Sequence, residues 1–385
     1  MAASPVFLQT DWARELRGNR IHPQLKGRLL YQSNRPFGAK GRQFLIGFSA
    51  DEVHHALMGC KTNLCYRYVL LALVPGVLLM KKYAISREFF PWNLFAPPIS
   101  EKFLSMSVPL MKPPKFLWSD KDLDVASHEI ESFDGEKITC FVLSPKTLSK
   151  KMSCLVYFHG GGFVLEAAGH HYRNAMRYAR EVGCKVVFPL YRLAPKHPFP
   201  MFFEDCYAAF CWAYDHAGEL GIDTQHIGIG GDSAGATLAV GVCMMAKERN
   251  HPVQFRFQML PYPFLDARNE SESSKRFTDT PMWNSSLSDR IGPMTKAEKH
   301  HPNYAWYSPV EAKNFKGLPP AYIETAEFDC LHDDGILYAR LLREAGIGVT
   351  LNETLGTMHG FDIATKAPTT LAAMEQRIAF MKRLI

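Results

Sequence analysis

The sequence predicts an α/β protein whose central sheet is mostly parallel and is flanked by helices. From about residue 127 onward, short apolar runs of strand length alternate with stretches of helical length. Several of these runs are apolar throughout, which is typical of strands that are buried on both faces. One of them, residues 226–230, leads directly into a serine framed by glycines and then into a helical stretch.

The predicted elements begin with a hairpin. Residues 128–133 and 137–143 flank the pair Asp134-Gly135, which suits a tight turn between antiparallel strands. Strands are expected next at 153–158, 185–190, 226–230, 255–260, 321–325 and 349–355, and helices at 172–182, 202–216, 234–249 and 335–345. Because strands and helices alternate, we expect the strands to pair in parallel and the helices to cover both faces.

Two regions lie outside this alternation. Residues 1–120 precede the hairpin and become rich in aromatic residues, Met and Pro toward their end. Residues from about 266 to 312 separate two predicted strands and include Met282, Trp283 and Trp306. Long insertions between core elements are usually lids or binding loops. We therefore expect residues 1–120 and the insertion at about 266–312 to build a helical cap on a core domain of residues 121–385.

Composition and charge limit which binding partners and which cellular compartment are expected for this protein. The chain has 385 residues and a net charge of +6, and its basic residues are scattered, so no nucleic-acid binding is expected. Its 9 cysteines are odd in number and form no C-x-x-C pair, which predicts free thiols in a reducing, cytoplasmic compartment. The first residues show no basic start followed by an apolar stretch, so no secretory signal is expected.

One segment requires a membrane check. Residues 68–80 are apolar, but Arg67 and Lys81 limit the run to 13 residues and Pro75-Gly76 interrupts it. A membrane-spanning helix needs about 20 apolar residues. We therefore expect a buried or surface-associated helix pair here, and no stable membrane span.

The central chemical signal is Gly231-Asp232-Ser233-Ala234-Gly235, between a predicted strand and a predicted helix. In this context small residues allow a sharp turn that presents the serine hydroxyl at the N-terminus of a helix. The pattern alone is weak, because G-x-S-x-G also occurs by chance. Its position between strand and helix predicts that Ser233 is a nucleophile.

A second signal is His159-Gly160-Gly161-Gly162, which ends another buried strand. Three consecutive glycines have a high cost in backbone entropy. They let backbone N–H groups approach a developing oxyanion without obstruction by side chains. A flexible connecting loop is the alternative, but beside a nucleophilic serine we favour the oxyanion-binding interpretation.

A serine hydroxyl needs a neighbouring base, and the base needs an orienting acid. His359 is the histidine that lies between the last predicted strand and the last helix, so it is the expected base. Asp329, Asp333 and Asp334 all follow the strand at 321–325. Periodicity does not choose among these three carboxylates.

The motifs together resemble the hormone-sensitive-lipase family of α/β-hydrolases, which includes bacterial carboxylesterases and arylacetamide-deacetylase-like enzymes. The resemblance covers about residues 125 to 385 and is carried by residues 159–163, 191–200, 231–235, 329–333 and 359–361. It implies that Asp329 is the triad acid and that Asp333 is a structural second acid. It further implies oxyanion donors at Gly161, Gly162 and Ala234, with support from His159, Gly160 and Asp232.

Two positions depart from the family pattern. Cys330 stands where the family often has proline, and Lys196 stands where glutamate is common. The first change is expected to loosen the loop of Asp329, and the second to lie on the surface.

The resemblance implies a serine carboxylesterase that acts on short- to medium-chain esters through an acyl-enzyme, without a metal ion or cofactor. The alternatives are an acetyl-ester or amide deacetylase acting on a sugar or aryl substrate, an interfacial lipase and, least favoured, a ligand-binding protein that has lost catalysis. The expected partner is a small-molecule ester. The family often forms homodimers through the last strand and helix, so this pairing is also an expectation.

Overall fold

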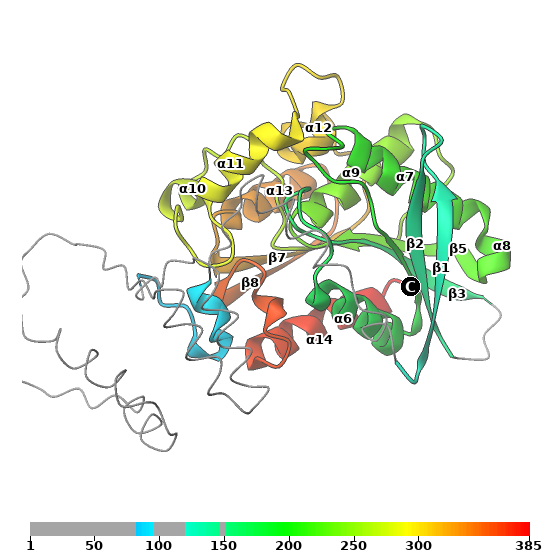
Figure 1. Cartoon of the computed structure of the whole chain (residues 1–385), viewed down its shortest axis with the longest axis horizontal. Helices are drawn as coiled ribbons and strands as arrows, with labels where there is room; N and C mark the ends of the chain where they lie inside the picture. The colour runs from blue at the N-terminus through cyan, green and yellow to red at the C-terminus, as the bar shows by residue number, and fades with distance from the viewer. Residues whose placement is uncertain (1–81, 96–119, 147–150) are drawn as a thin grey trace, which may run out of the picture. The chain divides into compact units, whose positions relative to one another are not determined.

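The computed structural model describes residues 82–95, 120–146 and 151–385, and the described strands form one eight-stranded sheet (Figure 1). The order across the sheet is β1-β2-β4-β3-β5-β6-β7-β8. From β4 onward neighbouring strands are parallel, whereas β1 and β2 are antiparallel. The strands are β1 (Leu123–Glu131), β2 (Lys137–Pro145), β3 (Met152–Phe158), β4 (Lys185–Pro189), β5 (Ile222–Gly231), β6 (Gln258–Pro261), β7 (Ala321–Phe328) and β8 (Val349–Met358).

The predicted hairpin is confirmed. Glu131 of β1 pairs with Lys137 of β2, and Gly135 has a φ of +82° in the turn between them. β1 begins at Leu123, earlier than the predicted 128. β1 is an edge strand with many half-buried and exposed residues, so its first half lacks the apolar run that marks the inner strands.

Helices cover both faces of the sheet. Successive residues of β3 point to opposite sides: Tyr157 packs in the cluster that includes α6 and α14, and Phe158 in the cluster with α7, α9 and α13. In Figure 1, α6 and α14 lie below the sheet, and α7, α9 and α13 lie above it. These helices are α6 (Gly169–Tyr178), α7 (Met201–Asp215), α9 (Ala234–Glu248), α13 (His332–Glu344) and α14 (Pro368–Lys382), with a short α8 (Ala217–Leu220) after α7.

The four predicted helices are present, with shifted ends. α6 begins at Gly169 where 172 was expected, and it continues as one π-helical turn, Ala179–Gly183. α13 begins at His332 where 335 was expected. Neither start has a side-chain N-cap, because Ala168 and Leu331 occupy the N-cap positions.

The insertion between β6 and β7 contains short helices, drawn in yellow in Figure 1: α10 (Glu272–Arg276), α11 (Ser285–Thr295), α12 (Tyr304–Tyr307) and the 3₁₀ turn Pro309–Glu311. The side chain of Asn284 caps α11 by accepting the backbone N–H of Leu287. Where the insertion begins, the Asp334 carboxylate accepts the N–H groups of Leu265 and Asp266 at 3.2 and 3.1 Å. The insertion is thus tied to the start of α13.

The described part of residues 1–120 contacts this insertion. It contains two 3₁₀ turns, Arg87–Phe89 and Trp92–Leu94. Met282 donates its backbone N–H to the carbonyl of Phe95 at 2.6 Å, and the Tyr83 hydroxyl donates to Asp279 at 2.5 Å. A helical cap made from residues 1–120 and the insertion stays a prediction, since most of residues 1–119 lie outside the described ranges.

Two expectations from composition can be compared with the described residues. Within ranges 82–95, 120–146 and 151–385, no helix combines the length and the apolar character needed to cross a membrane. Residues 68–80 lie outside these ranges. The cysteines in the same ranges are free, and all are buried except the half-buried Cys211. This agrees with the prediction of free thiols.

Packing between α7 and α9 depends on one glycine. A Cβ at Gly241 would collide with the ring of Phe203, whereas a Cβ at Gly218 of α8 would meet open space. We expect Gly241→Ala to lower the free energy of unfolding by about 1–3 kcal/mol, because the core would be overpacked. The control Gly218→Ala should raise it by up to about 1 kcal/mol, since alanine favours helix. Urea unfolding measures both, and equal effects would contradict this packing.

Candidate active site

Ser233 lies in a sharp turn between β5, which ends at Gly231, and α9, which begins at Ala234. Its backbone has φ 54° and ψ −120°, a sparsely populated conformation for a residue with a side chain. The turn is held because Ser233 donates its N–H to the carbonyl of Pro261 at 3.0 Å. A Cβ at Gly235 would collide with the carbonyl of Phe158, so the turn and β3 approach too closely for a larger residue.

The Ser233 hydroxyl is linked to a histidine and a carboxylate in a row. Its Oγ lies 2.8 Å from Nε2 of His359, which follows β8. Nδ1 of His359 lies 2.7 Å from Oδ2 of Asp329, which follows β7. Since a carboxylate only accepts, Nδ1 carries the proton, and Nε2 is left to accept the serine hydroxyl. All three side chains are buried, and both Ser233 and His359 are 6% exposed.

The three acids left open by the sequence have different surroundings. Asp329 lies beside His359, as the family resemblance implies, and its Oδ1 accepts the N–H of Leu331 at 2.9 Å. Asp333 instead accepts the N–H of Ser273 in α10 at 2.8 Å, which is a structural contact with the insertion. Asp334 is buried where the insertion begins, and burial raises its pKa well above the usual range.

Three backbone N–H groups near Ser233 are free to bind an oxyanion. Among the described residues, the N–H groups of Gly161, Gly162 and Ala234 donate to no backbone or side-chain acceptor. Gly162 has a φ of +61°, and a Cβ there would lie 2.6 Å from the ring of Trp283. A Cβ at Gly160 would collide with the Asp232 carboxylate. Close packing against Asp232 and against Trp283 therefore accounts for glycine at positions 160 and 162.

His159 supports this glycine loop. Its Nδ1–H donates to the carbonyl of Gly160 at 2.7 Å, and its ring stacks on Tyr191 with centroids 4.4 Å apart. The Tyr191 hydroxyl donates to the carbonyl of His159 at 2.7 Å. Burial lowers the pKa of His159 to about 3, so the ring is neutral at physiological pH. Its contacts are those of a supporting residue, and it does not touch the Ser233 hydroxyl.

Asp232 is held behind the turn by Tyr157 and His171. The Tyr157 hydroxyl donates to Oδ1 at 2.5 Å, and His171 Nε2 lies 3.1 Å from Oδ2. His171 belongs to no motif that the sequence analysis singled out; its role becomes visible only when α6 is placed against β5.

His170, His171 and Asp232 are all potential metal ligands, and their ligand atoms lie within 4.8 Å of one another. However, Nδ1 of His171 accepts the backbone N–H of Ala168 at 2.8 Å. The proton of this ring therefore sits on Nε2 and is donated to Asp232. No lone pair of His171 remains for a cation, so this group does not fit a metal ion.

A cavity opens beside Ser233. Its wall combines the glycine loop and the start of α9 with residues of the insertion, where Trp283 donates its Nε1–H to Ser288 at 3.0 Å. The lining residues are Gly162, Phe163, Ser233, Ala234, Phe264, Trp283, Ser288, Ile291, Gly292, Tyr307 and Leu331. Of the two tryptophans in the insertion, Trp283 lines the cavity, whereas Trp306 packs on Phe203.

The two positions that depart from the family pattern, Cys330 and Lys196, both lie in the described part of the chain. Cys330 is fully buried, and the Asp329 carboxylate next to it keeps its hydrogen bonds to His359 and Leu331. The expected loosening of the Asp329 loop stays a prediction. Lys196 is exposed, as expected.

Comparison with known proteins identifies the family. A family model described as alpha/beta hydrolase fold matches residues 155–363. The chain is an α/β-hydrolase. The match covers the glycine loop, the Ser233 turn, Asp329 and His359, and it confirms the resemblance to the hormone-sensitive-lipase group.

Individual relatives of this α/β-hydrolase are esterases by name. Carboxylesterase NlhH of Mycobacterium tuberculosis is 33% identical over 259 residues, which cover 66% of this chain and 81% of that protein. A bacterial heroin esterase structure is 31% identical, with a TM-score of 0.65, and the match covers 74% of this chain and 90% of that one. A hyperthermophilic esterase from Pyrobaculum calidifontis is 29% identical with a TM-score of 0.67, and the match covers 75% and 93%.

Proposed function

We propose that this α/β-hydrolase is a carboxylesterase that hydrolyses short- to medium-chain esters, with Ser233 as nucleophile, His359 as base and Asp329 as orienting acid. The observation that carries the proposal is the hydrogen-bonded row Ser233–His359–Asp329 next to free N–H donors at a small cavity. The esterase names of its relatives support the same reaction class.

In the first half of the reaction, Nε2 of His359 takes the Ser233 proton while Oγ attacks the ester carbonyl carbon. The carbonyl oxygen gains negative charge, and the N–H groups of Gly161, Gly162 and Ala234 stabilise it. Asp329 keeps the Nδ1 proton in place and stabilises the imidazolium. Collapse of the tetrahedral intermediate gives the acyl-enzyme, and the departing alcohol takes the proton from Nε2.

In the second half, His359 removes a proton from a water molecule, which attacks the acyl carbon. The same N–H donors stabilise the second oxyanion, and Nε2 returns the proton to Ser233 Oγ as the carboxylic acid leaves. The named residues move every proton in these steps, so the proposed reaction requires neither a metal ion nor a cofactor.

The cavity favours one part of the ester. A departing alcohol must lie near His359 Nε2 to receive its proton, but His359 is not among the residues that line the cavity. The cavity contains Gly162 and Ala234, which would bind the acyl oxygen, so it takes the acyl chain. Apolar and aromatic side chains, among them Phe264, Trp283 and Ile291, line this cavity, which suits the apolar acyl chain of an ester.

The remaining expectations stay predictions. These are the helical cap of residues 1–120 and about 266–312, a homodimer, a cytoplasmic location and the lack of nucleic-acid binding. The lipase alternative depended on residues 68–80, which lie outside the described ranges. No described contact favours a deacetylase over a general esterase.

The triad is tested with p-nitrophenyl esters from acetate to palmitate. We expect Ser233→Ala to lower kcat by about 10⁴-fold or more, since the nucleophile is lost. Asp329→Asn should lower kcat by about 10⁴-fold because the imidazole tautomer is no longer fixed. Asp333→Asn is the matched control and should retain most activity. Equal losses in the two aspartate variants would contradict the assignment of Asp329.

The acyl-chain assignment is tested on α11. Ile291 is buried and lines the cavity, whereas Leu287 is equally buried on the same helix but does not line it. We expect Ile291→Ala to raise kcat/KM for long acyl chains relative to acetate, because the cavity becomes deeper. Leu287→Ala should lose similar stability and keep the wild-type chain-length profile. If Ile291→Ala also keeps that profile, the cavity does not hold the acyl chain.

A further inference from the structure

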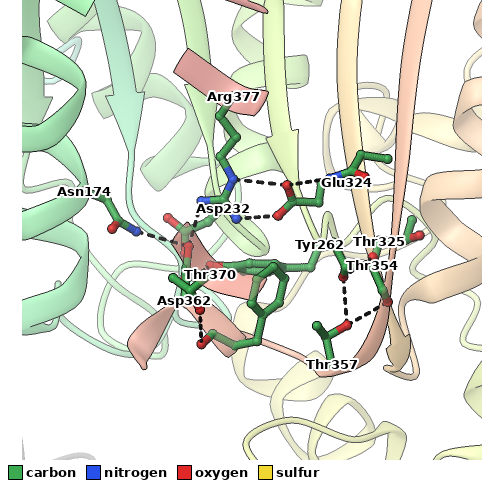
Figure 2. A network of polar contacts seen from close by, with 12 residues as sticks. Asn174, Asp232, Tyr262, Glu324, Thr325, Thr354, Thr357, Asp362, Thr370 and Arg377 are labelled. Atoms are coloured by element: carbon green, nitrogen blue, oxygen red, sulfur yellow. Dashed lines mark hydrogen bonds and ion pairs between the residues drawn. The ribbon is translucent and has the colours of Figure 1, made fainter. Parts of the chain in front are cut away.

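A buried ionic cluster lies behind the candidate base. Arg377 of α14 is fully buried, and it pairs with Glu324 of β7 and, at 2.8 Å, with Asp362 (Figure 2). Glu324 is 0% exposed and Asp362 is 1% exposed, so all three charges are removed from water. Buried charges require complete pairing, since one left without a partner is strongly unfavourable.

Asp362 is held from three directions. Its carboxylate accepts from Arg377 Nη1 at 2.8 Å, from the Tyr262 hydroxyl at 2.7 Å and from Asn174 Nδ2 at 3.1 Å. Arg377 belongs to α14, Tyr262 follows β6, and Asn174 belongs to α6. Figure 2 shows Asn174, Arg377 and Tyr262 arranged around this one carboxylate. Three separate elements are thereby joined at a single residue.

Asp362 and His359 share one tight turn. Gly360, with a φ of +63°, follows His359 directly, and Asp362 lies within the 3₁₀ turn Phe361–Ile363. The backbone N–H of Ile363 donates to the carbonyl of Gly360 at 3.1 Å, which closes the turn. A fixed Asp362 therefore limits how far the backbone of His359 can move.

Tyr262 contacts both the carboxylate and the base. Its ring centroid lies 5.1 Å from that of His359 in an edge-to-face arrangement, while its hydroxyl reaches Asp362. Its own backbone N–H donates to the carbonyl of Glu324 at 2.6 Å. Through Glu324, Tyr262 is connected to the same ionic cluster, so its ring is held at a defined position beside the imidazole.

We propose that Asp362, held by Tyr262 and Arg377, is a positioning residue that keeps His359 Nε2 within hydrogen-bonding distance of Ser233 Oγ. This inference rests on the proposed function. A purely structural cluster would affect stability alone. A positioning cluster also affects kcat, because small displacements of a reacting group lower the rate of a chemical step.

The test removes a single hydrogen bond. Tyr262→Phe deletes the donor to Asp362 but keeps the ring beside His359 and all buried charges. We expect kcat for p-nitrophenyl acetate to fall by about tenfold or more with KM unchanged, because the chemical step and not substrate binding is impaired. The matched control is Tyr338→Phe, which deletes a buried hydroxyl bonded to Gln258 on a different part of the core.

The control should keep the wild-type kcat. Equal kcat values in folded Tyr262→Phe and Tyr338→Phe would overturn the proposal, as would a rise in KM with kcat unchanged. Wild type and Ser233→Ala are measured in the same series, so a failure of the proposed function shows as an inactive wild type.

Amide hydrogen exchange gives a second readout that needs no turnover. Exchange in residues 358–363 should be faster in Tyr262→Phe than in wild type and unchanged in Tyr338→Phe. Unchanged exchange in Tyr262→Phe would overturn the proposal even if the wild type hydrolysed none of the esters.

Discussion

The site depends on one constraint, namely that the carboxyl ends of β5, β7 and β8 lie at the same edge of a parallel sheet. Ser233, Asp329 and His359 follow these three strands and are separated by long stretches of chain. Parallel pairing of β5 with β6, β6 with β7 and β7 with β8 brings their ends together. The hydrogen bonds of 2.8 and 2.7 Å between the three side chains follow from this arrangement.

Close backbone packing is the second constraint. The Ser233 turn packs closely against the end of β3. The glycine loop that follows β3 packs closely against Asp232 and Trp283. Neither contact leaves room for a Cβ, so both segments are built from glycine at a cost in backbone entropy. The N–H groups of Gly161 and Gly162 have no acceptor among the described residues. Packing and the proposed oxyanion binding thus favour the same residue type.

The sequence predicted those parts of the site that have a local signature. The Ser233 turn and the glycine run are recognisable because the backbone geometry demands small residues at fixed spacing. His359 was identified by its place after the last strand. Asp329 was not separable from Asp333 and Asp334 by pattern, and it was assigned through the family resemblance. The choice among them depends on the direction of each side chain, which no local pattern records.

Contacts between distant elements had no such signature. Arg377 is a charged residue in a C-terminal helix, and nothing in its neighbourhood predicts complete burial beside Glu324 and Asp362. His171 likewise reads as a polar helix residue until α6 is packed against Asp232. The edge strand β1 was predicted too short, because its exposed residues interrupt the run of apolar residues that marks a strand. Such features become visible only in the folded chain.

The most direct measurement of the proposed chemistry is covalent labelling with diethyl p-nitrophenyl phosphate, which phosphorylates activated serines and releases p-nitrophenolate. We predict that each chain releases one p-nitrophenolate, that peptide mass spectrometry finds the diethyl phosphate on Ser233, and that ester hydrolysis is lost in proportion to labelling. A label on another residue, or full esterase activity in a chain labelled at Ser233, would contradict the role of Ser233 as nucleophile.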